Sequence, residues 1–220
     1  MATRSRTPIR LRNLNCDGRY GAALLAICGL VLALQLFGSA AIHLLRYDRT
    51  AIVAGEWWRL LTAHLIHLNF HHAVLDLGGL ALLWALFARD FRPWAWTVVI
   101  LITAAAIDCG LWLRDPGVEW YVGVSGVLHG VLAAGAFVRL RKGKFEGWML
   151  TGLLLAKLAY EQLHGALPFA GDMPVIVDAH LYGALGGLAA AILLDLSGMT
   201  ARLGFPASRR GRGVKKPARG

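Results

Sequence analysis

Long apolar stretches separated by short polar connections dominate this 220-residue chain. Windows of about 20 residues with few charges are typical of helices that cross a bilayer. Six stretches fit: about Tyr20–His43, Leu60–Ala88, Trp94–Leu113, Tyr121–Leu140, Gly147–Leu163 and Val175–Leu196. The second is long for a single span, so we expect its first turns to lie above the hydrocarbon. The pattern predicts an all-α membrane protein with a bundle of six transmembrane helices.

The composition supports this class. The chain is 57% hydrophobic and its mean hydropathy is +0.54, which is too apolar for a soluble domain of this length. The short connections leave no room for a second soluble domain. We therefore expect a basic N-terminal segment (1–19), one helical domain (20–196) and a basic tail (197–220) whose Gly/Arg/Lys-rich sequence favours disorder.

The positions of the basic residues predict the orientation. Lys and Arg gather in the N-terminal segment, in the second and fourth connections (near 89–92 and 139–144) and in the tail. The positive-inside rule places these regions in the cytoplasm, and an even number of spans agrees. The net charge of +10 is then explained by contact with anionic lipid headgroups, so no nucleic-acid partner is expected.

Two polar residues stand at matching depth in different spans. Ser125 lies about four residues into the fourth span, and His180 lies about five residues into the sixth. In the predicted topology both spans run inwards, so each residue lies roughly 6–8 Å below the start of its helix. Polar side chains are costly in hydrocarbon and indicate function by default. A serine beside a histidine is the minimum required for covalent hydrolysis.

Further polar and small residues fall in the same layer. The second span carries four histidines and an acid, of which His72 and Asp76 are four apart and share a helix face. Gly123 and Gly126 flank Ser125, while Gly183 and Gly187 follow His180. Small residues at such spacing let helix backbones approach closely. A hydrogen bond between Ser125 and His180 needs this approach.

At these residues the chain resembles the rhomboid intramembrane serine proteases. The family's G-x-S-G motif matches Gly123–Gly126, and its A-H-x-x-G-x-x-x-G motif matches Ala179–Gly187. Its W-R pair matches Trp58-Arg59, and its H-x-x-x-N pattern aligns with His72–Asp76. The resemblance covers the six-helix core, roughly residues 20–196, and so nearly the whole chain.

The resemblance implies a serine endopeptidase that uses no cofactor or metal. Ser125 would be the nucleophile, His180 the base, and the Ser125 N–H with the side chains of His72 and residue 76 the oxyanion donors. Two positions depart from the family pattern. Asp76 replaces an asparagine, and we expect it to orient His72, although a protonated carboxyl that donates directly is the alternative. His129 replaces a tyrosine that packs on the catalytic histidine, so it either packs there or is a hydrogen-bonded helix residue.

The small size and the run from Ser125 to Gly130 resemble the rhombosortase subgroup. That likeness implies substrates with a single membrane span, or with short C-terminal glycine-containing membrane tags on exported proteins. It also implies a bacterial-type inner membrane as the location, with the active site toward the periplasmic or extracellular side.

Three alternatives remain open on the sequence. His64, His67, His71 and His72 would suit a metal or haem protein, but no H-E-x-x-H motif is present. Lys157 would be the base of a Ser/Lys protease, although a structural pair with Glu161 one turn later is the preferred interpretation. An inactive rhomboid-like protein that only binds membrane helices is the third. Asp178 lies on a different helix face from His180, so a Ser/His dyad is expected.

Overall fold

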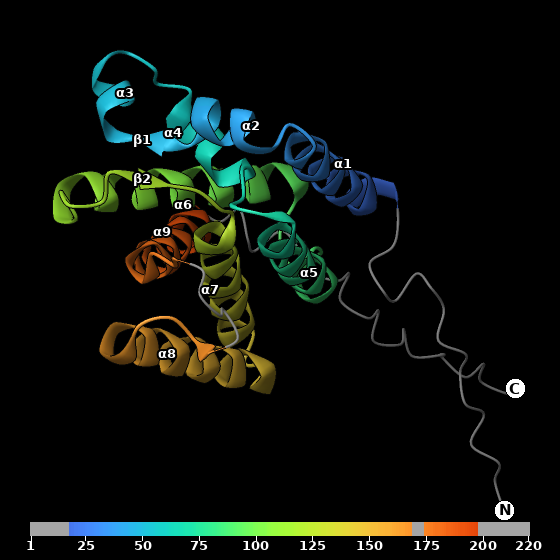
Figure 1. Ribbon diagram of the computed structural model, residues 1–220. Helices are drawn as coiled ribbons and strands as arrows, with labels where there is room; N and C mark the ends of the chain where they lie inside the picture. The colour runs from blue at the N-terminus through green and yellow to red at the C-terminus, as the bar shows by residue number, and fades with distance from the viewer. Residues whose placement is uncertain (1–17, 169–173, 198–220) are drawn as a thin grey trace, which may run out of the picture.

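The computed structural model describes residues 18–168 and 174–197, and this part of the chain is predominantly helical (Figure 1). The two predicted terminal segments therefore lie almost entirely outside the described residues. In order, the elements are α1 (Gly18–Gln35), α2 (Gly38–Leu45), β1 (Tyr47–Asp48), α3 (Arg49–Val53), α4 (Arg59–Thr62), η2 (Ala63–Leu65), α5 (Phe70–Phe87), α6 (Pro93–Arg114), β2 (Trp120–Tyr121), α7 (Ser125–Arg141), α8 (Phe145–His164) and α9 (Val177–Leu196).

Three of the described helices, α5, α6 and α9, are long and apolar enough to cross a membrane. The pair α1 and α2 makes a fourth if it counts as one span. Helices α7 and α8 occupy the predicted fourth and fifth stretches. However, α7 has only 17 residues, and Lys157 and Glu161 lower the hydropathy of α8. By length and composition the described residues thus contain up to four spans, which is fewer than the six predicted.

The first predicted helix is wrong as a single straight element. The chain bends by 109° between α1 and α2. The break falls at a two-residue turn before Gly38, whose φ of 54° lies in the left-handed region that glycine tolerates best.

The second predicted stretch also divides, as its length suggested. α4 and η2 form a short upper piece, and α5 begins only at Phe70. The side chain of Asn69 accepts a hydrogen bond from the His72 N–H (2.8 Å), which caps the first turn of α5. This cap fixes the start of the helix that carries His72 and Asp76.

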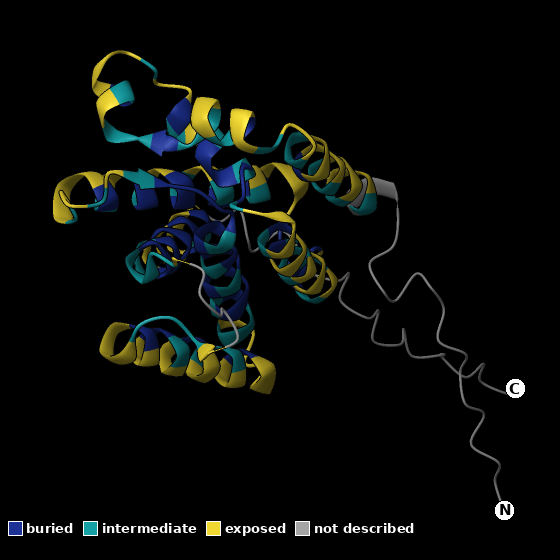
Figure 2. Ribbon diagram, in the orientation of Figure 1, coloured by how far each residue is buried: buried dark blue, intermediate teal, exposed yellow. Residues whose placement is uncertain are grey.

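Helix α7 is the centre of the fold, with α5, α6, α8 and α9 around it (Figure 1). Most of α7 is buried, whereas α8 and α5 expose long apolar faces (Figure 2). Its tightest neighbour is α9. A Cβ added to Gly183 would overlap the carbonyl oxygen of Gly126, and one on Gly187 would overlap that of Gly130. The predicted close approach through glycine is therefore confirmed.

The segment between α2 and α4 is fastened to the bundle. β1 pairs antiparallel with β2, so that Tyr47 lies opposite Tyr121. Arg59 is buried; it forms an ion pair with Glu56 and donates to the carbonyl oxygens of residues 43 and 46 at 2.9 and 3.0 Å. Trp57 is 68% exposed, as expected of a side chain at a membrane interface. These contacts hold the segment against β2, which leads into the loop before Ser125.

Candidate active site

Ser125 is the first residue of α7, at the end of a tightly held loop. The N–H of Gly123 donates to the carbonyl of Ala63 (3.0 Å), and the hydroxyl of Tyr121 donates to the carbonyl of Gly123 (2.8 Å). Gly123 has a φ of +120°, and a Cβ there would also press on the ring of His72. Only glycine fits both conditions. The loop therefore presents Ser125 with its N–H at a helix N-terminus, where backbone donors have no intrahelical partner.

His180 lies in the first turn of α9, directly opposite Ser125. The serine Oγ and the histidine Nε2 are 3.0 Å apart, and His180 is only 5% exposed. The contact exists because α7 and α9 meet through glycines just below it. The predicted juxtaposition of the two residues is thus present in the structure.

A third side chain, which the sequence analysis did not assign to the site, completes a chain of contacts. Glu161 of α8 places Oε2 3.0 Å from Nδ1 of His180 and Oε1 2.7 Å from Nζ of Lys157. The pairing of Lys157 with Glu161 was predicted from their spacing, but the contact with His180 was not. Asp178 instead accepts a hydrogen bond from Gln162 (3.1 Å), in keeping with its expected position off the histidine face.

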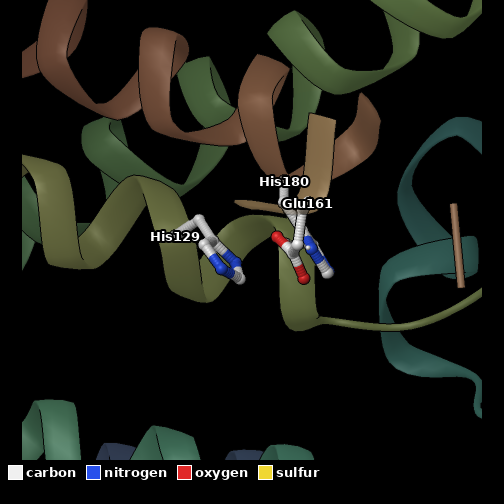
Figure 3. Close-up of side chains that lie close together, drawn as sticks. All are labelled: His129, Glu161 and His180. Carbon is white, nitrogen blue, oxygen red and sulfur yellow. Dashed lines mark hydrogen bonds and ion pairs between the residues drawn. The ribbon is translucent and has the colours of Figure 1, made fainter. Parts of the chain in front are cut away.

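His129 satisfies both interpretations offered for it. Its ring is stacked on that of His180, with centroids 4.1 Å apart and planes at 17°. Its Nδ1 lies 2.7 Å from the carbonyl oxygen of Ser125. A carbonyl only accepts, so Nδ1 of His129 carries a proton. Figure 3 shows His129, Glu161 and His180 close together. His129 therefore packs against the ring of His180 and is hydrogen-bonded to its own helix.

Asp76 lies between two histidine rings. Its Oδ2 is 3.3 Å from Nε2 of His72 and 3.1 Å from Nε2 of His67, and its side chain is largely buried. The contact with His72 is the one expected from their spacing on α5. The contact with His67 was not foreseen, because the loop that returns His67 toward α5 has no signal in the sequence.

The four histidines proposed as a metal or haem site do not share one position. His67 and His72 face Asp76, His64 faces Asp108 at 3.4 Å, and His71 is exposed. Within residues 18–168 and 174–197, the one group with metal-like spacing is His129, Glu161 and His180. Its two rings are stacked, and the Nδ1 atoms of His129 and His180 already face the Ser125 carbonyl and Glu161.

A cavity of about 660 Å³ opens over these residues. Its polar end holds Ser125, His180, His72 and Asp76, together with Lys157 and Glu161. Its apolar wall comes from α5 and α7, through Leu75, Leu82, Leu128 and Leu132. Ala166, Leu167 and Val175 border it from the connection between α8 and α9, of which residues 169–173 lie outside the described part. The cavity combines an apolar groove with convergent polar groups, as ligand sites commonly do.

Comparison with known proteins identifies the family of the chain. Residues 54–196 match the Rhomboid domain. Over 192 residues the chain is 24% identical to a Bacillus subtilis (strain 168) protein named "Putative rhomboid protease YdcA", covering 84% of this chain and 94% of that protein. It is 30% identical over 157 residues to uncharacterized proteins of Mycobacterium bovis and Mycobacterium tuberculosis, covering 66% of this chain and 62% of theirs. The chain belongs to the rhomboid family, a helical membrane-protein family of intramembrane proteases.

Proposed function

We propose that this protein is an intramembrane serine endopeptidase in which Ser125 and His180 perform the chemistry. The observation that carries the proposal is the 3.0 Å contact between Ser125 Oγ and His180 Nε2 at the polar end of the cavity. A nucleophile within hydrogen-bond reach of a base is the geometric signature of covalent hydrolysis.

The reaction follows the ordinary course of acyl transfer. Ser125 Oγ attacks the carbonyl carbon of the substrate while its proton passes to Nε2 of His180. The tetrahedral intermediate expels the amine, which takes that proton, and an acyl-enzyme remains on Ser125. Water, deprotonated by His180, then attacks the acyl carbon and releases the new carboxyl end and the serine hydroxyl.

The oxyanion needs donors near Ser125. The Ser125 N–H lies at the start of α7, where the helix dipole also favours negative charge. His72 lines the same cavity, with Asp76 3.3 Å from its Nε2. The Asp76 carboxylate can therefore orient the His72 ring beside Ser125, and His72 is the proposed second donor of the oxyanion site.

The apolar groove favours a substrate that is itself a membrane segment. It runs along α5 and α7 beneath a polar end, so an extended or unwound apolar chain brings a carbonyl to Ser125. The run from Ser125 to Gly130 supports the finer assignment to the rhombosortase type, which acts on short glycine-containing C-terminal tags. The basic connections support cytoplasmic termini, six spans with α7 and α8 included, and an active site facing the outer side of a bacterial-type inner membrane.

Co-expression with reporters tests the proposal. One reporter is an exported protein with a single ordinary span, and the other carries a glycine-containing C-terminal tag in its place. We expect wild type to release the tagged reporter and Ser125→Ala to leave it intact at equal expression. Cleavage of the ordinary span alone would contradict the subgroup. Equal cleavage by Ser125→Ala would contradict the mechanism, and cleavage of neither reporter would favour an inactive membrane-helix-binding protein.

A further inference from the structure

We propose that Glu161 is the third member of a Ser–His–Glu triad, a positioning residue that fixes the tautomer and orientation of His180. The inference rests on the proposed function. It deepens the expected dyad by assigning the buried acid of α8 to the reaction.

The geometry places the acid on the correct ring atom. Nε2 of His180 faces Ser125 at 3.0 Å, and Nδ1 faces Glu161 Oε2 at 3.0 Å. An ionised carboxylate only accepts hydrogen bonds, so the ring proton lies on Nδ1. The lone pair of Nε2 is then directed at the serine hydroxyl. This is the tautomer that a general base requires.

The burial of Glu161 argues against an incidental contact. Its side chain is 3% exposed, in a helix that otherwise presents apolar residues to the bundle. A buried carboxylate is costly unless it is paired and hydrogen-bonded. Glu161 has both kinds of partner, because Lys157 holds Oε1 at 2.7 Å while His180 holds Oε2. Lys157 therefore keeps the carboxylate charged and leaves one oxygen free for the histidine.

The charges balance during the reaction. When His180 accepts the serine proton, the ring becomes a cation between Glu161 and the substrate. The carboxylate stabilises this imidazolium without taking the proton, which later leaves with the amine. His129 stacks on one face of the His180 ring and so restricts its tilt. Three helices, α7, α8 and α9, thus each supply one member of the triad.

Wild-type protein provides the first test, because the tautomer is read from the unaltered protein. In ¹⁵N-histidine NMR spectra, with His180 assigned by comparison with His180→Ala, we expect the neutral ring to carry its proton on Nδ1. A proton on Nε2 would overturn the inference.

Variants provide the second test, with the reporter that wild type cleaves. For Glu161→Gln we expect kcat to fall by about 10²–10⁴ while KM changes by less than about threefold, because only the transition state is affected. Glu161→Asp retains a carboxylate and should recover part of kcat. Glu146→Gln removes an exposed acid from the same helix and should behave as wild type.

The outcomes separate the two proposals. If Ser125→Ala abolishes cleavage but Glu161→Gln keeps the wild-type kcat, the triad is wrong and the Ser/His mechanism stands. A kcat for Glu161→Asp no higher than for Glu161→Gln would also count against a carboxylate acting on His180. If Ser125→Ala cleaves as wild type does, the proposed function itself fails.

Discussion

Gly183 of α9 lies so close to Gly126 of α7 that a Cβ on Gly183 would overlap the Gly126 carbonyl oxygen. This backbone contact sits directly below the Ser125–His180 hydrogen bond. It sets the distance between the two helices on which the candidate nucleophile and base are carried. The geometry of the site therefore depends on residues that have no side chain.

Adding a methyl group at this contact should separate the helices. For Gly183→Ala we expect a loss of about 1–3 kcal/mol in the free energy of unfolding, as for other overpacked sites, and a large loss of cleavage. Thermal unfolding in detergent measures the first effect. Gly152→Ala is the matched control: it lies in helix α8 with open space around its Cβ, so it should be neutral or slightly stabilising. Equal stability of the two variants would contradict the close contact.

Asp76 should hold His72 and His67 by stronger hydrogen bonds as a carboxylate than an asparagine amide would. Asp76→Asn leaves a neutral oxygen for two ring donors, and charge-assisted hydrogen bonds are stronger than neutral ones by about 1 kcal/mol, or about fivefold in rate. We therefore expect a severalfold lower kcat, measured on the reporter that wild type cleaves. A gain in activity would show that residue 76 donates directly, as an asparagine would.

Lys157 supports Glu161 and is not expected to act as the base. Lys157→Met removes the ion pair with Glu161, so we expect lower thermal stability and a reduced but measurable rate. His180→Ala should abolish cleavage while the protein stays folded. The opposite pattern, an inactive Lys157→Met beside an active His180→Ala, would assign the chemistry to a Ser/Lys pair.

The stability that Asp48 gives to the β1–α3 region should be lost only in strong acid. Burial raises the pKa of Asp48, but hydrogen bonds from Thr50, the Ala51 N–H and Arg46 outweigh it and lower this pKa to about 2. A folded-state pKa below the unfolded value of about 3.9 gives stability that is present above about pH 4 and lost as pH falls through about 2.

The test is Asp48→Ala, which removes the N-cap of α3 and should cost about 1 kcal/mol at neutral pH. The difference in thermal unfolding midpoint between wild type and Asp48→Ala should stay constant from about pH 8 to 5 and become smaller below about pH 4. Glu119→Ala, which removes an exposed acid nearby, should have the same midpoint as wild type. A difference between wild type and Asp48→Ala that grows in acid would contradict the assignment.

Sequence patterns predicted those features that depend on local spacing. The glycine pairs and the neighbouring positions of His72 and Asp76 follow from helix periodicity. The predicted position of Ser125 about four residues into its helix is wrong, because α7 begins at Ser125 itself, after the loop that contains Gly123. What the sequence did not reveal depends on how separate elements meet. Glu161 reaches His180 only because α8 packs against α7 and α9, and its i,i+4 spacing indicated Lys157 alone. The bend at Gly38 likewise lies inside a continuous apolar run, where hydropathy carries no signal.

The central claim is that Ser125 is a nucleophile activated by His180. Its most direct test is reaction of the purified protein with a fluorophosphonate, followed by mass spectrometry of the modified peptide. We predict a single adduct on Ser125 in wild type and none in His180→Ala. An adduct on another residue, or equal labelling of Ser125 in His180→Ala, would contradict the claim.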